Sequence, residues 1–138
     1  MLNGIENFIT MINQINDLKI AVIGLGYVGL PLVLEFSKKI QVIGFDTNKR
    51  RIRELKFGKD KNLEFGKHDL KKNKKLQFTH NVNDLKLVNC FIITVPTPID
   101  KNKKPDLKPL NEASKIVGKK LKKKDLVIFE STVYPGCI

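Results

Sequence analysis

Short hydrophobic runs alternate with amphipathic stretches along most of this chain. Five runs have the length and the β-branched content of buried strands, and they lie at residues 20–23, 41–45, 76–79, 89–95 and 126–130. Between the runs, apolar residues recur at intervals of three and four, as they do in helices. This alternation predicts an α/β fold with a doubly wound parallel sheet in the order 3-2-1-4-5 and helices on both faces.

The apolar spacing also predicts where the first two helices lie. After the first strand, Val28, Leu32 and Phe36 recur at intervals of four, so a helix is expected directly after this strand. Asn48 has the side chain of an N-cap and predicts a helix from there through Leu55. Both helices therefore fall directly behind a strand, as crossover helices should.

The remaining segments are assigned in the same way. Residues 58–74 are polar and basic and predict a surface excursion of the chain, that is, a long loop. Residues 82–88 predict a short helix. A longer helix begins after Asp106. Its buried face is predicted to comprise Leu107, Leu110, Ser114, Val117 and Leu121. Residues 1–17 predict a helical extension, so the domain proper spans residues 18–138.

Three glycines follow the first strand in the spacing G-x-G-x-x-G, and each has its own physical role. Gly24 permits the tight turn off the strand. A side chain at Gly26 would stand between the backbone and a pyrophosphate, and one at Gly29 would push the helix off the sheet. The helix N-terminus offers unpaired N–H groups to phosphates. This stretch predicts a dinucleotide-binding turn of the Rossmann type.

An acidic residue supports the same kind of ligand. Asp46 ends the second strand about twenty residues after the glycines, where a carboxylate can accept both hydroxyls of an adenosine ribose. A 2′-phosphate there would meet a negative charge, so NAD is expected to be preferred over NADP. The alternative is a glycine-rich turn of an unrelated α/β protein, in which Asp46 only caps the strand.

Two other features are open to more than one interpretation. Pro96 and Pro98 stiffen the backbone after the fourth strand, where open α/β sheets bind ligands, although the residues alone favour a stiff loop without a ligand. Arg51 lies shortly after Asp46. It can reach an adenine or project into solvent, and the residues alone favour solvent.

Composition narrows the function classes. The 138 residues are 41% hydrophobic, which fits one globular domain, and the net charge is +12. All basic residues except Arg50, Arg51 and Arg53 are lysines, whereas nucleic-acid readout favours arginine and interleaved aromatic residues, so no nucleic-acid partner is expected. No run has the length of a membrane span and no signal peptide is apparent. A cytoplasmic protein without a membrane partner is therefore expected.

The cysteines and histidines suggest neither a disulfide framework nor a metal site. Cys90 lies in an apolar run and Cys137 lies next to the end of the chain, so both are expected to be free thiols. His68 and His80 lie on polar segments, and their spacing matches no metal site.

Five motifs together carry a resemblance to a known family. They are GLGYVGLP at residues 24–31, FDTNKRRI at 45–52, TVPTP at 94–98, PDL at 105–107 and ESTVYPG at 130–136. In this order and spacing the chain resembles the UDP-glucose/GDP-mannose dehydrogenase family, and within it the UDP-N-acetylhexosamine 6-dehydrogenases of bacterial surface-polysaccharide synthesis.

The resemblance implies NAD as cofactor and assigns the residues around it. It implies that Asp46 binds the adenosine ribose and that Arg51 packs beside the adenosine. It places Thr132 near the nicotinamide, as an accessory catalytic residue that positions water or substrate. The implied cofactor-binding set is Gly24, Gly26, Tyr27, Val28, Gly29, Asp46, Arg51, Val95, Pro96, Thr97, Ser131 and Thr132.

The resemblance also implies the reaction of the intact protein. Family members oxidise C6 of a nucleotide sugar from alcohol to acid in two NAD-dependent steps, through a thioester on a cysteine far downstream. The implied partners are NAD, a UDP-N-acetylhexosamine and a second copy in a homodimer. Cys137 matches no catalytic position of the family, and no histidine lies near it in the sequence. This chain by itself is therefore expected to be inactive.

Two other functions stay open. One is a stand-alone NAD-binding module without turnover, and the other is a Rossmann dehydrogenase of the hydroxyacyl-CoA or phosphogluconate kind. The turns at residues 94–98 and 131–136 favour the UDP-sugar enzymes over the second.

Overall fold

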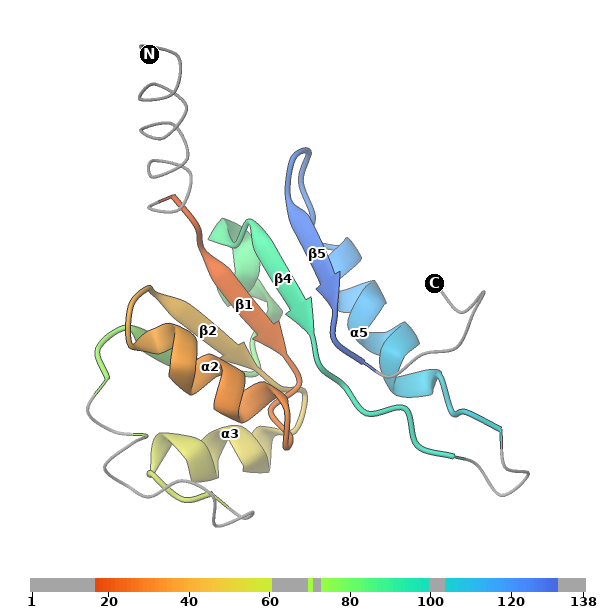
Figure 1. Cartoon of the computed structure of the whole chain (residues 1–138), viewed down its shortest axis with the longest axis horizontal. Helices are drawn as coiled ribbons and strands as arrows, with labels where there is room; N and C mark the ends of the chain where they lie inside the picture. Colours follow the sequence, from red (N-terminus) through yellow and green to blue (C-terminus); the bar gives the residue numbers. More distant parts are fainter. Residues whose placement is uncertain (1–16, 61–69, 71–72, 100–103, 132–138) are drawn as a thin grey trace, which may run out of the picture.

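The computed structural model describes residues 17–60, 70, 73–99 and 104–131 (Figure 1). In this part of the chain five strands form one parallel sheet in the order β3-β2-β1-β4-β5. The strands are β1 (Ile20–Ile23), β2 (Val42–Phe45), β3 (Leu76–Thr79), β4 (Cys90–Ile93) and β5 (Leu126–Phe129). The predicted fold class and strand order are confirmed, and each strand lies within the hydrophobic run that predicted it.

The strands are aligned so that their carboxyl ends meet at one edge of the sheet. Ile23, the last residue of β1, lies opposite Phe45 of β2 on one side and Ile93 of β4 on the other. The segments that leave these three strands therefore emerge side by side. In an open parallel sheet this is the point where ligands bind, because the connections on its two sides run to opposite faces.

Helices cover both faces of the sheet. The crossovers α2 (Gly29–Ser37) and α3 (Lys49–Lys56) pack on one face, and the 3₁₀ helix η1 (Val82–Leu87) and α5 (Lys108–Gly118) pack on the other. The short helix predicted at residues 82–88 is thus present, as a 3₁₀ helix. Right-handed crossovers explain the split, since the chain moves outward in one direction from β1 to β3 and in the other from β4 to β5.

The buried face of α2 is rotated away from the apolar positions that recur at intervals of four. The helix buries Leu30, Val33 and Leu34, whereas Val28 is 54% exposed and Leu32 and Phe36 are half-buried at the border of the core. A repeat of four drifts by about 40° per step around a helix with 3.6 residues per turn. The positions at this spacing therefore begin outside the buried face and reach only its border.

The buried face of α5 differs from the predicted one. Ala113 is buried where Ser114 was expected, and Ser114 is half-buried. Leu121 is 45% exposed because α5 ends at Gly118 and the lysine-rich turn that follows is not helical. Leu110 and Val117 are buried as predicted.

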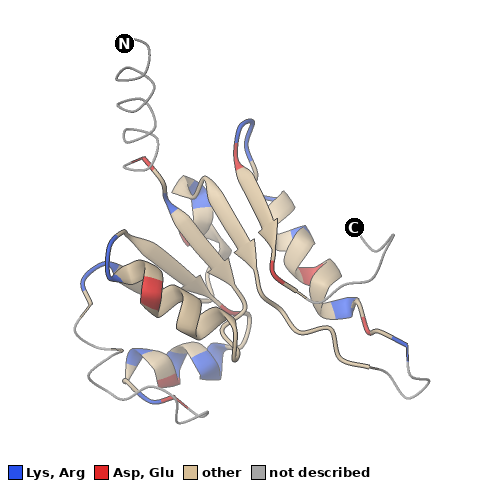
Figure 2. Cartoon of the chain, viewed as in Figure 1, with Lys and Arg blue, Asp and Glu red and all other residues tan. Residues whose placement is uncertain are grey.

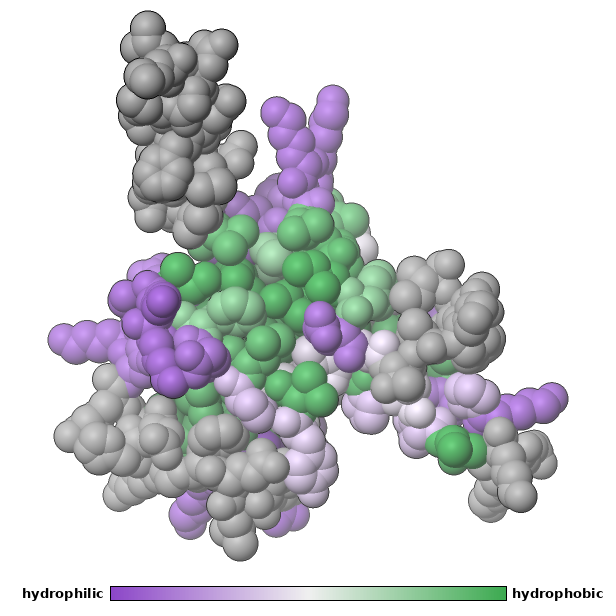
Figure 3. All heavy atoms as spheres, viewed as in Figure 1, coloured by the Kyte–Doolittle hydropathy of each residue, from purple (hydrophilic) through white to green (hydrophobic). Residues whose placement is uncertain are grey.

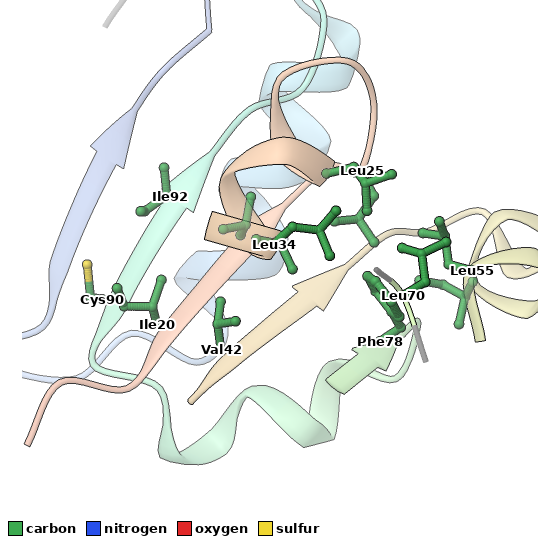
Figure 4. Packing of buried hydrophobic residues seen from close by; sticks show 13 residues of the cluster. Ile20, Leu25, Leu34, Val42, Leu55, Leu70, Phe78, Cys90 and Ile92 are labelled. Carbon is green, nitrogen blue, oxygen red and sulfur yellow. The ribbon is translucent and has the colours of Figure 1, made fainter. Parts of the chain in front are cut away.

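One cluster of apolar side chains fills the space between the sheet and the helices α2 and α3. Figure 4 shows Leu70 beside Leu55 and Phe78 in this cluster. Leu70 is only 6% exposed, so the segment at residues 58–74 is not wholly a surface excursion. Cys90 belongs to the same cluster and is a buried free cysteine, as predicted, and burial raises the pKa of its thiol.

Charge and hydropathy are distributed unevenly over the surface. Lys and Arg residues are concentrated along α3 and on the turn before β5 (Figure 2). Figure 3 shows a hydrophobic area on the face that carries α2. The edge strand β5 is incompletely covered, and its first residue, Leu126, is 52% exposed.

Several expectations fall on residues outside the described part of the chain. They are the helical extension before Asp17, His68, Thr132 and Cys137. His80 is described and exposed, as expected. No helix among the described residues is both long and apolar enough to cross a lipid bilayer.

Candidate functional site

The glycine turn connects β1 to α2 at the carboxyl edge of the sheet. Gly24 has a φ of +102°, which side chains rarely tolerate, and its N–H donates to Phe45 O at 2.8 Å. A Cβ at Gly29 would lie 1.8 Å from Gly24 O, whereas a Cβ at Gly26 would meet no atom of the described residues within 4 Å. Gly29 is therefore needed for packing within the protein, and Gly26 faces open space in which a phosphate can approach the backbone.

Thr94 holds this turn from the neighbouring strand. Its hydroxyl, on a residue that is 7% exposed, lies 2.8 Å from Gly24 O and 3.2 Å from Ile23 O, to which it can donate. Thr94 belongs to the sequence motif at residues 94–98, but the sequence analysis assigned it no role. A hydroxyl directly after the strand that pairs with the glycine strand is the signal that could have identified it.

Gly29→Ala is expected to lower the free energy of unfolding by about 3 kcal/mol or more, because backbone must move to relieve the contact with Gly24 O. Urea denaturation followed by circular dichroism measures the change. Gly118→Ala is a matched control, since a Cβ there meets no described atom within 4 Å. Equal stability of the two variants would contradict the packing role of Gly29.

Asp46 connects the glycine turn to the start of α3. Its Oδ2 accepts a hydrogen bond from Leu25 N at 3.0 Å, and its Oδ1 accepts one from Asn48 N at 2.8 Å. Each oxygen retains a lone pair with which to accept from a ligand hydroxyl. Asn48 caps α3 as predicted, because its side chain accepts from Arg50 N and Arg51 N.

Arg51 does not project into solvent. It is 6% exposed, its Nε donates to Leu25 O at 3.0 Å, and its Nη1 lies 2.7 Å from Oδ1 of Asp60. The preference for solvent that the residues alone suggested is therefore wrong. Local periodicity misses this burial because the counter-charge lies on the segment that follows the helix.

These groups surround one cavity of about 370 Å³. The volume is in the range of small-ligand sites. The predicted site residues that line it are Gly24, Gly26, Tyr27, Asp46, Arg51, Val95 and Pro96. The helix α5 completes the wall with four residues that no motif indicated, namely Pro109, Glu112, Ala113 and Ile116.

The other predicted residues that the structure describes do not line the cavity. Gly29 is buried under the turn, and Val28 is exposed at the N-terminus of α2. Thr97 is half-buried in the loop after β4. Ser131 Oγ donates to Val95 O at 2.7 Å and so ties the end of β5 to that loop. Thr132 lies outside the described residues.

The chemistry of the cavity suits a polar ligand with phosphates and hydroxyls. The cavity offers the open backbone of the glycine turn and, next to it, the carboxylate of Asp46. Pro109 and Ile116 give the α5 wall an apolar character, and Glu112 adds a second carboxylate. In the part of the chain that the structure describes, no three His, Cys, Asp or Glu side chains are grouped to hold a metal ion.

Comparison with known proteins identifies relatives that share this domain. Residues 18–138 match the family model described as "UDP-glucose/GDP-mannose dehydrogenase family, NAD binding domain". The chain is 60% identical over 120 residues to the UDP-N-acetyl-D-glucosamine 6-dehydrogenase of Pseudomonas aeruginosa and 56% identical over 123 residues to that of Salmonella typhi. These matches cover 87% and 89% of this chain but only 28% and 29% of the relatives.

A solved structure shows the same fold at lower identity. The UDP-D-ManNAc dehydrogenase of Pyrococcus horikoshii superposes with a TM-score of 0.81 and is 37% identical. The match covers 86% of this chain and 29% of that one. The chain thus spans less than a third of the length of these relatives.

Proposed function

Because the chain belongs to the UDP-glucose/GDP-mannose dehydrogenase family and matches its NAD-binding domain, we propose that the intact protein oxidises a UDP-N-acetylhexosamine to the uronic acid. The chain described here binds NAD for that reaction. The observation that carries the proposal is one cavity bordered by the glycine turn, Asp46 and Arg51, in a chain 60% identical to a UDP-N-acetyl-D-glucosamine 6-dehydrogenase. We place the intact enzyme in the cytoplasm, as a homodimer that serves surface-polysaccharide synthesis.

The residues that border the cavity fit NAD. The open space at Gly26 admits the pyrophosphate, and the N-terminus of α2 directs N–H groups toward it. The free lone pairs of Asp46 accept the hydroxyls of the adenosine ribose. NAD, when bound, supplies the acceptor for the hydride that leaves C6 of the sugar.

The remaining predicted site residues are assigned by the resemblance to this family. Tyr27 and Val28 lie against the dinucleotide beside the glycine turn. Val95, Pro96 and Thr97 border its path along the end of β4. Ser131 and Thr132 are proposed to lie toward the nicotinamide, where the hydroxyl of Thr132 positions water or substrate. This assignment is supported by the order of the segments at the carboxyl edge of the sheet.

NAD is expected to bind at least about tenfold more tightly than NADP. A 2′-phosphate would meet the carboxylate of Asp46, and the nearby arginines already have acidic partners. Arg50 Nε lies 2.9 Å from Glu54 Oε1, and Arg51 Nη1 lies 2.7 Å from Asp60 Oδ1. Calorimetric titration with both cofactors measures the ratio of NAD affinity to NADP affinity, and Asp46→Asn should lower this ratio. NADP affinity equal to or above NAD affinity would overturn the role of Asp46.

The activity of the intact protein is tested by NADH formation. With UDP-N-acetylglucosamine or UDP-N-acetylgalactosamine, two NADH are expected for each sugar oxidised to the acid, and UDP-glucose serves as the comparison substrate. Turnover of UDP-glucose, without turnover of either UDP-N-acetylhexosamine, would be consistent with the family but would refute the proposed N-acetylhexosamine substrate. The absence of turnover with all three nucleotide sugars, in a protein that binds NAD, would favour the stand-alone NAD-binding module.

A further inference from the structure

We propose that Asp60 holds Arg51 under the glycine turn and thereby helps to select NAD over NADP. This inference rests on the NAD-binding role of the cavity, and it assigns a function to a residue outside the motifs that define the site. Asp60 does not line the cavity. It is a positioning residue that acts on the cofactor through Arg51.

The local chain geometry explains how Asp60 reaches Arg51. After α3, Gly58 adopts a φ of +75°, and its N–H donates to Leu55 O at 2.9 Å. The N–H of Lys59 donates to Glu54 O at 2.9 Å. This glycine cap reverses the chain at the helix end. The reversal brings Asp60 back beside the helix, where its side chain is completely shielded from solvent.

The guanidinium of Arg51 depends on this carboxylate. Its Nε donates to a neutral carbonyl oxygen, and its Nη2 is buried without a hydrogen-bond partner in the described residues. Among the described residues, Asp60 is the one carboxylate within ion-pair distance of Arg51. Removing one member of a buried ion pair leaves an uncompensated charge, which is strongly unfavourable. A guanidinium without Asp60 is therefore driven toward the cavity that Arg51 lines.

The pair acts on the site through the backbone of Leu25. Asp46 accepts a hydrogen bond from Leu25 N at 3.0 Å, and Arg51 donates to Leu25 O at 3.0 Å. Leu25, which lies between the first two motif glycines, is thus held by a hydrogen bond at its N–H and by another at its C=O. While Asp60 holds Arg51, the turn is fixed and the positive charge of Arg51 is neutralised. A released Arg51 would loosen the turn and bring an unpaired cation into the cavity that Asp46 borders.

The test is calorimetric titration of the 138-residue chain and its variants with NAD and with NADP. Asp60→Asn is expected to weaken NAD binding about fivefold and to lower the NAD-to-NADP affinity ratio about tenfold. Adding Arg51→Gln to Asp60→Asn removes the released cation, so the ratio should return toward the wild-type value while NAD binding stays weak. That recovery distinguishes selection through Arg51 from a general loss of structure.

Asp125→Asn is the matched control. Asp125 is also a shielded carboxylate, with a 5% exposed side chain 3.4 Å from Lys122 Nζ, but it lies before β5 at the amino edge of the sheet. This variant is expected to keep the wild-type affinity ratio. If Asp60→Asn does not fold, Asp60→Glu is titrated instead and should lower the ratio two- to threefold. A wild-type ratio in the folded Asp60 variant would overturn the proposal, even if NAD binding by the cavity is confirmed.

Discussion

Gly26→Val is expected to abolish measurable NAD binding while the domain stays folded. Gly26 is exposed, and a Cβ at this position would meet no atom of the described residues within 4 Å, so the protein can accommodate the side chain. The branched side chain would occupy the space through which the turn approaches a pyrophosphate. The loss of affinity should be at least about a hundredfold, which corresponds to about 2.7 kcal/mol. Calorimetric titration with NAD measures it, and circular dichroism reports the fold.

Gly118→Val is the matched control for this substitution. Gly118 ends α5, and a Cβ there also meets no described atom within 4 Å, but the position does not line the cavity. This variant should bind NAD like the wild type. Wild-type affinity in a folded Gly26→Val protein would show that phosphate binds elsewhere.

The second large effect is an absence of turnover. Given NAD and a UDP-N-acetylhexosamine, the 138-residue chain is expected to form no NADH. Among the residues that the structure describes, those that line the cavity include two carboxylates, Asp46 and Glu112, but no cysteine, lysine or histidine. Cys90 is buried in the core, away from the residues that line the cavity, and burial raises the pKa of its thiol, which disfavours the thiolate. Without a nucleophile and a sugar held near the cofactor, the cavity offers only the oxidant.

Absorbance at the NADH band, with UDP-N-acetylglucosamine and UDP-N-acetylgalactosamine, measures this directly. Sustained NADH formation would show that the chain contains a complete catalytic site. Its disappearance in a Cys137→Ser variant would identify Cys137 as the nucleophile, against the expectation from the family. Its persistence in that variant would point to another residue of the chain.

The sheet could be predicted from the sequence alone, because parallel strands buried on both faces are continuous apolar runs and each run here ends in a distinctive turn. The strand order followed from the handedness of the crossovers. The helix faces were harder to predict. Short helices offer only two or three turns of pattern, and in α5 this pattern pointed to Ser114 where Ala113 is buried.

The site could be predicted only where local chemistry defines it. The glycine turn and Asp46 have characteristic positions relative to their strands, and the structure brings them to one cavity. The burial of Arg51 depends on Asp60, and the lining role of Glu112 depends on how α5 packs. Both are tertiary relationships that leave no periodic signal in the sequence.

The contact between Thr94 and the glycine turn also constrains the order of events during synthesis. The hydroxyl of Thr94 reaches a carbonyl that precedes it by 70 residues. At a translation rate of about 5–20 residues per second, roughly 4–14 s pass between the synthesis of the glycine turn and the synthesis of Thr94. During that interval the central strand β1 lacks one of its two neighbours, and its apolar side chains are available to chaperones. Cofactor can stabilise the nascent chain only after β4 has emerged from the ribosome and paired with β1.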